Sequence, residues 1–144
     1  MTRVLRERLA FLVYDAQKEF AEASALLELV TANRVPAPET IAVEPAAYLN
    51  GLAEAAGELR RHLLDRLREG DVAYCARCLG WMDEIYGQLV TIDYPDAMTG
   101  GLRRNTDMVR GVLEKSRGDL TAAARQRALE ERLAHIEANI GSSA

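Results

Sequence analysis

The sequence has few of the residues that interrupt regular secondary structure, with four prolines and ten glycines among 144 residues. This composition and a 49% hydrophobic content argue against disorder and favour a globular domain. No apolar run approaches the roughly 20 residues of a transmembrane helix, and no signal peptide opens the chain. We therefore expect one intracellular, cytoplasmic domain over residues 1–140, with no membrane partner and a disordered tail at 141–144.

Cysteine is also scarce, since the chain has only Cys75 and Cys78, in the stretch CARC. Two cysteines cannot build a disulfide framework, and one C-x-x-C pair cannot supply all four ligands of a structural zinc site. The pair also lacks the βαβ setting of a thioredoxin-like redox motif. We expect both cysteines to be small helix residues.

No segment shows the alternating apolar pattern of a β-strand, and the apolar spacing is helical throughout. The pattern predicts an all-α fold, an antiparallel multi-helix bundle of about five helices with short turns. Pro45 suits the first turn of a helix, Asp71 suits an N-cap, and Gly118-Asp119 should separate the last two helices. The expected helices cover 4–32, 45–69, 72–92, 102–116 and about 120–140, with a short turn at 38–42 between the first two.

Two of these helices have clear apolar stripes that we expect to face the core. On the first helix the stripe consists of Leu9, Leu12, Val13, Phe20, Leu27 and Val30. On the second it consists of Tyr48, Leu49, Leu52, Ala56, Leu59, Leu63 and Leu67.

Two acidic pairs lie at the flanks of these stripes, Glu19 with Glu22 and Glu54 with Glu58. Spacings of three and four place each pair on one helix face, so neighbouring helices can offer four carboxylates to one cleft. Their repulsion would be offset by a hard divalent cation, for which Mg²⁺ or Mn²⁺ is the natural choice. The alternative is solvated surface charge, with Glu58 paired to Arg61 or His62. Ferritin-like di-iron chemistry fits less well, because it uses Glu-x-x-His and His62 follows Glu58 by four.

An ordered set of segments resembles the translin family, and most closely its prokaryotic members, over about residues 9–135. The segments are EFAEA (19–23), YLNGLAEAAGELRR (48–61), REGD (68–71), MDEIYGQL (82–89), DYPDAMTGGLRRNTDMVRGVLEKSRGDLT (93–121) and ARQRALEERL (124–133). The family's usual N-terminal pair of helices is absent from this sequence. The resemblance implies an all-helical fold, a homo-oligomer that is typically an octamer, and binding of single-stranded RNA or DNA.

The resemblance is closest to the catalytic subunit of the family, translin-associated factor X, a metal-dependent endoribonuclease. Its Glu-aromatic-x-Glu-Ala motif falls on Glu19 to Ala23, and its Gly-x-Ala-acid-x-x-Gly-Glu motif falls on Gly51 to Glu58. By this resemblance Glu19, Glu22, Glu54 and Glu58 are the catalytic, metal-binding carboxylates, with Mg²⁺ or Mn²⁺ as the cofactor. Glutamate at position 54 replaces the aspartate that is usual in the family.

The charge distribution offers candidate contacts to nucleic acid. Residues 103–132 hold eight Lys or Arg and five Asp or Glu, in a chain whose net charge is −4. A guanidinium binds phosphate in a bidentate manner, so we expect nucleic-acid contacts from Arg60, Arg61, Arg103 and Arg104. The competing interpretations are a nucleic-acid-binding module without catalysis and an oligomeric scaffold without a nucleic-acid role.

Overall fold

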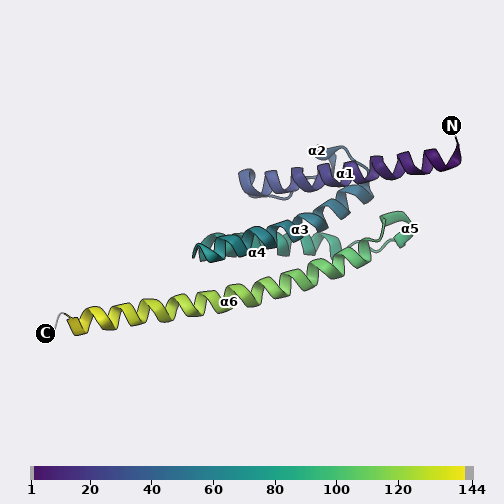
Figure 1. Cartoon of the computed structure of the whole chain (residues 1–144). Helices are drawn as coiled ribbons and strands as arrows, with labels where there is room; N and C mark the ends of the chain where they lie inside the picture. Colours follow the sequence, from purple (N-terminus) through teal and green to yellow (C-terminus); the bar gives the residue numbers. More distant parts are fainter. Residues whose placement is uncertain (1, 142–144) are drawn as a thin grey trace.

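The computed structural model describes residues 2–141, and these residues form an all-α bundle (Figure 1). The four long helices are α1 (Arg3–Ala32), α3 (Pro45–Arg68), α4 (Val72–Val90) and α6 (Leu102–Gly141), and the connections contain the short α2 (Pro38–Ile41) and α5 (Asp96–Thr99). The all-α prediction is confirmed. The expected disordered tail is contradicted at Gly141, which ends α6, while residues 142–144 lie outside the described part. Among residues 2–141, no helix combines the length and apolar character needed to cross a membrane.

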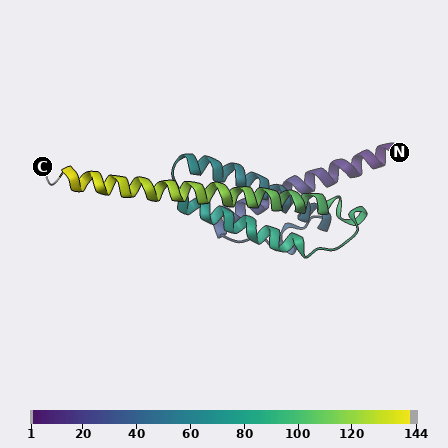
Figure 2. The same ribbon diagram turned by 90° about the horizontal axis from the view of Figure 1, so that it is seen from below.

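The long helices alternate in direction from α3 to α4 to α6, as the antiparallel prediction expects (Figures 1 and 2). However, α1 and α3 run in the same direction, because the connector 33–44 returns along the bundle before α3 begins. The parallel course of these two helices places Tyr14 beside Asn50 and Lys18 beside Glu54.

The residues predicted to begin, cap or separate helices do so at Pro45, Asp71 and the turn at 38–42. Pro45 lies in the first turn of α3, and Asp71 caps α4 by accepting a hydrogen bond of 3.0 Å from the backbone N–H of Tyr74. Gly70, between α3 and α4, has a φ of +80°, which glycine adopts more readily than other residues. The predicted turn at 38–42 is the short helix α2, whose Ile41 is buried against the core.

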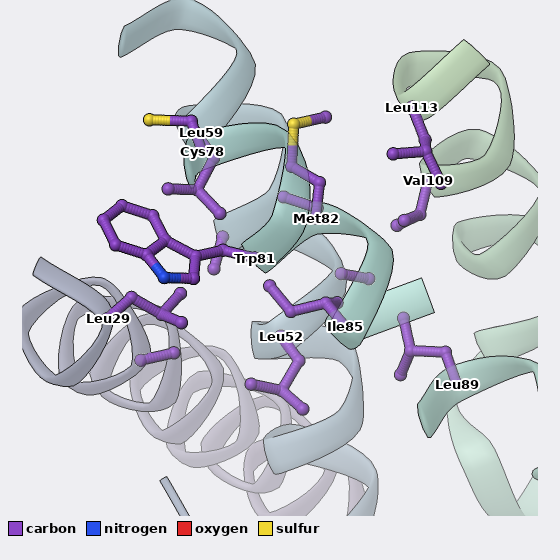
Figure 3. Close-up of a cluster of buried hydrophobic side chains, with 14 of the residues drawn as sticks. Leu29, Leu52, Leu59, Cys78, Trp81, Met82, Ile85, Leu89, Val109 and Leu113 are labelled. Carbon is purple, nitrogen blue, oxygen red and sulfur yellow. The ribbon is translucent and has the colours of Figure 1, made fainter. Parts of the chain in front are cut away.

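Helix α3 lies at the centre of the bundle and packs against α1, α4 and α6. Its predicted stripe faces the core, with Leu49 and Leu67 half-buried and the other members buried. Figure 3 shows Leu52 and Leu59 of α3 near Leu29 of α1 and Trp81 of α4. Both cysteines are free and fully buried in the same core, as expected of small helix residues.

The predicted apolar stripe of α1 is exposed, which corrects the sequence interpretation. Its six side chains are between 44% and 65% exposed, whereas Ala21, Ala25 and Leu29 are the buried residues of this helix. Because α1 packs mainly against α3, only one narrow face is covered, and that face consists mostly of small residues.

Helix α6 is continuous, so the predicted break at Gly118-Asp119 is wrong. A mid-helix glycine costs about 1 kcal/mol relative to alanine, and packing on α3 and α4 offsets a cost of that size. Leu120 is its last buried residue, Arg127 still donates a hydrogen bond to the Gly70 carbonyl oxygen, and the C-terminal part of the helix extends past the end of the bundle (Figures 1 and 2). We call residues 121–141 the α6 arm.

Candidate functional site

The two acidic motifs meet beside a close contact between α1 and α3, at Gly51. A Cβ atom at Gly51 would lie 2.7 Å from the Ala21 Cβ and 2.7 Å from the carbonyl oxygen of Lys18. Only glycine fits this contact without displacing backbone, so Gly51 sets the distance between the helices. Gly57 has open space around it and plays no such part.

Glu22 is the centre of the acidic cluster. Its side chain is half-buried, and this burial is the largest cause that raises the pKa of the carboxyl above its usual range. The negative charges of Glu54, Glu58 and Glu19 raise the pKa further. The structure therefore brings all four predicted carboxylates into one electrostatic neighbourhood around Glu22.

Lys18 also belongs to this cluster, although the sequence interpretation did not include it. Its Nζ lies 2.7 Å from Glu54 Oε1 and 3.2 Å from Asp15 Oδ1, and the side chain is only 20% exposed. The hydrogen bond to Glu54 is the largest cause that raises the pKa of the Lys18 ammonium. The spacing of three between Asp15 and Lys18 was the available signal, but the contact with Glu54 depends on the parallel packing of α1 and α3.

Glu58 makes one of the pairings that the sequence left open, because Arg61 Nη1 lies 3.1 Å from its Oε1. His62 instead faces the Tyr74 hydroxyl, with Nε2 at 3.1 Å. Two of the four carboxylates, Glu54 and Glu58, thus have a cationic side chain as a neighbour.

Within residues 2–141, no three His, Cys, Asp or Glu side chains are grouped closely enough to hold a metal ion. Glu54 is paired with Lys18 and Glu58 with Arg61. The donor set itself fits Mg²⁺ or Mn²⁺, because carboxylate oxygens are the ligands that hard cations prefer. The cluster therefore contains carboxylate oxygens of the kind that hard cations prefer, and two of its four glutamates are paired with Lys18 and Arg61.

The four predicted phosphate-binding arginines differ in their surroundings. Arg60 is only 18% exposed and ties α3 to α6, donating to Ser116 Oγ at 2.9 Å and to Asp119 Oδ2 at 2.8 Å. Arg61, Arg103 and Arg104 are exposed. Arg60 therefore has a role in helix packing, and the other three are accessible to a ligand.

Comparisons with known proteins give relatives of similar fold. No family model matches the chain. An uncharacterized protein of Methanocaldococcus jannaschii is 33% identical over 122 residues, which cover 84% of this chain and 54% of that protein.

Two solved structures of AfC3PO, one in complex with duplex RNA, resemble the chain with TM-scores of 0.78 and 0.75 and identities of 37% and 36%. Each match covers 88% of this chain and 66% of AfC3PO. The structure of apo-NeC3PO matches with a TM-score of 0.69 and 26% identity, covering 76% of this chain and 57% of that one. The chain thus spans about half to two thirds of the length of these relatives.

These matches extend over most of the chain, at more than one third identity to AfC3PO. The chain therefore belongs to the translin-like C3PO family.

Proposed function

We propose that this protein binds single-stranded RNA or DNA and cleaves RNA as a Mg²⁺- or Mn²⁺-dependent endoribonuclease. The observation that carries the proposal is the half-buried Glu22 carboxyl beside the close contact of α1 with Gly51 of α3, where burial and then the charges of Glu54, Glu58 and Glu19 raise its pKa. Natural proteins retain such repulsion mainly where it serves a function. The complex of the related AfC3PO with duplex RNA supports RNA as the ligand class.

The proposed metal ligands are Glu19, Glu22, Glu54 and Glu58, which supply only carboxylate oxygens. These residues would hold Mg²⁺ or Mn²⁺, which would supply a lowered pKa for a water and positive charge opposite the phosphate oxygens. On the protein side, Gly51 fixes the separation of the two acidic helices. One of these four carboxylates that does not hold the metal directly would accept the proton of the attacking water.

Lys18 neutralises Glu54 in the arrangement described above, and we assign it the role of a built-in competitor of the metal. Because one ammonium and one divalent cation compete for the same carboxylate, Lys18→Met should strengthen Mn²⁺ binding. The readout is Mn²⁺ titration by calorimetry or electron paramagnetic resonance. Unchanged or weaker binding in Lys18→Met would contradict this role.

The test of the function is a cleavage assay on labelled single-stranded and duplex oligoribonucleotides with Mg²⁺, Mn²⁺ or EDTA. We expect EDTA to abolish cleavage, and Glu22→Gln and Glu58→Ala to reduce it by about 100-fold or more, in the range of a lost general acid–base or metal-ligand group. Binding of RNA to both variants should persist.

Glu28→Gln is the matched control, because Glu28 is a half-buried glutamate of α1 that pairs with Arg34 at 2.8 Å, outside the cluster. It should cleave at the wild-type rate. Cleavage that persists in EDTA, or in Glu22→Gln at full rate, would reject the carboxylate site. RNA binding without cleavage in the wild type would instead favour the non-catalytic binding module.

A further inference from the structure

A second cluster of polar side chains lies beyond the carboxylates, where the C-terminal part of α3 meets the start of α4. Glu58 and His62 are one turn apart on α3, so about 6 Å along the helix axis separates them. His62 Nε2 lies 3.1 Å from the hydroxyl oxygen of Tyr74, and the two rings meet edge to face with centroids 5.3 Å apart. A site around Tyr74 therefore begins one helical turn beyond the acidic cluster.

Two arginines lie over the ring of Tyr74, one from each helix. The guanidinium carbon of Arg77 on α4 is 4.8 Å from the ring centroid, and that of Arg66 on α3 is 5.4 Å from it. Cation–π attraction holds a guanidinium against the face of an aromatic ring. The N–H donors lie at the edge of the planar guanidinium, so a stacked arginine can still bind an anion.

The ring of Tyr74 is held by a chain of contacts that reaches three helices. Trp81 of α4 meets it edge to face with centroids 6.0 Å apart. Trp81 Nε1 donates a hydrogen bond of 2.7 Å to Oδ1 of Asn33, the residue that ends α1. His62 supplies the contact from α3. Because Trp81 is buried and Tyr74 is half-buried, the ring that supports the arginines is in place before a ligand binds.

Arg77 is exposed, and its charge has no partner in the protein. Within residues 2–141, no carboxylate lies within ion-pair distance of its guanidinium. Arg66 Nη1 lies 2.9 Å from Glu69 Oε2, but both side chains are well exposed, and such a pair is weak. Asp71 accepts a hydrogen bond from the backbone N–H of Tyr74. An anion can therefore reach Arg77 without displacing a carboxylate.

We propose that Arg77, with Arg66 beside it, binds a backbone phosphate of the RNA strand, and that Tyr74 is the positioning residue for both guanidiniums. The subsite rests on the proposed function, because it holds a strand that the carboxylates cleave. Arg66 follows Glu58 by two turns of α3, about 12 Å along the axis. Contacts with phosphates fix the register of a strand without reading its bases. The subsite thus determines which part of the strand lies at the carboxylates.

Other exposed arginines of the chain lack this arrangement. Within residues 2–141, Arg66 and Arg77 are the arginines that lie over an aromatic ring. The three arginines of the α6 arm are exposed, but none of them has a ring against it in the described part of the chain. Arg8 is exposed near the start of α1, at the end of the bundle opposite to the turn between α3 and α4 (Figure 1). It provides a matched control for Arg77.

The test is binding of a labelled single-stranded oligoribonucleotide to the full chain in EDTA, measured at several salt concentrations. Arg77→Met and the control Arg8→Met remove the same charge from an exposed helix position. One lost phosphate contact with a single strand lowers the slope of log K against log salt by about 0.7, which is about fivefold weaker binding at about 0.1 M salt. We expect this loss for Arg77→Met with every oligonucleotide sequence, and no loss for Arg8→Met. Equal effects of the two substitutions, or wild-type affinity in Arg77→Met, would overturn the subsite.

The positioning role of Tyr74 is tested by two substitutions that leave both arginines in place. Tyr74→Phe keeps the face of the ring and should bind the oligoribonucleotide like the wild type. Tyr74→Leu removes the ring and should weaken binding as Arg77→Met does, with circular dichroism as the check on folding. Adding Arg77→Met to Tyr74→Leu should have little further effect, because the two changes remove the same contact. Wild-type binding by Tyr74→Leu, or full additivity in the double variant, would reject the positioning role.

Failure of the subsite and failure of the proposed function give different results. A wild-type chain that does not bind the oligoribonucleotide would reject both. A wild-type chain that binds it but does not cleave it with Mg²⁺ or Mn²⁺ would reject the nuclease alone. In that case the comparison of Arg77→Met with Arg8→Met still decides whether the phosphate site exists.

Discussion

Helices α1 and α3 both carry a long apolar stripe, but only the stripe of α3 faces the interior. Helix α3 is surrounded by α1, α4 and α6, so nearly every apolar side chain on it finds a neighbour. Helix α1 rests mainly on α3, and its large apolar residues point away while Ala21, Ala25 and Leu29 are buried. The difference shows that an apolar stripe in the sequence does not by itself predict which element of the fold covers it.

The largest effect on stability should come from truncating a buried leucine of α1, and truncating an exposed leucine of the same helix is the comparison. Leu29→Ala removes a fully buried side chain beside Leu52 and Trp81, and should lower the free energy of unfolding by about 2–5 kcal/mol. Leu27→Ala, two residues away and 65% exposed, should change it by less than about 0.5 kcal/mol in the monomer. Urea denaturation of both variants at low protein concentration provides the measurement.

A reversed order of these two effects would mean that the outer face of α1 is the packed one. A large effect for Leu27→Ala that appears only at high protein concentration would instead locate a second chain on this face.

The contact between α1 and α3 can be tested by adding a single methyl group. Gly51→Ala places a Cβ 2.7 Å from Ala21 and from the Lys18 carbonyl, and overpacking of this kind costs about 1–3 kcal/mol. Gly57→Ala, on the same helix with open space around it, should be stabilising by up to about 1 kcal/mol because alanine favours the helix. Thermal unfolding followed by circular dichroism distinguishes the two. Equal stabilisation by both substitutions would show that α1 does not approach α3 at Gly51.

The comparison also explains which parts of the molecule could be predicted from sequence. The helical period, Pro45, Asp71 and the α3 stripe are local signals, and the structure agrees with them. The inner face of α1 was missed because its contact with α3 depends on Gly51 and on the long connector, which are not visible in the periodicity of α1. Gly118 was misread because contacts with two other helices outweigh the helix propensity of one residue.

The candidate site was predictable to a similar extent. The spacing of the glutamates indicated one face on each helix, and the family resemblance joined the two pairs. Lys18 was missed because its Nζ reaches Glu54 only when α1 and α3 run in the same direction. The contacts of Arg60 with Ser116 and Asp119 could not be predicted, because these two residues are more than fifty positions away in the sequence.

The smallest effect concerns Glu22, which lies beside the packed face of α1 and is half-buried. Because its pKa is raised in the folded state, the native protein holds the proton more tightly than the unfolded chain. This contribution to stability is fully present below the ordinary pKa near 4.5 and is lost as the pH rises through the native pKa. Glu22→Gln cannot titrate, so relative to wild type it should gain stability as the pH rises above about 4.5. Glu28→Gln should show the opposite trend, because Arg34 lowers the pKa of Glu28. Denaturant titrations at several pH values measure both differences, and a stability difference between Glu22→Gln and wild type that does not change with pH would show that folding does not raise the pKa of Glu22.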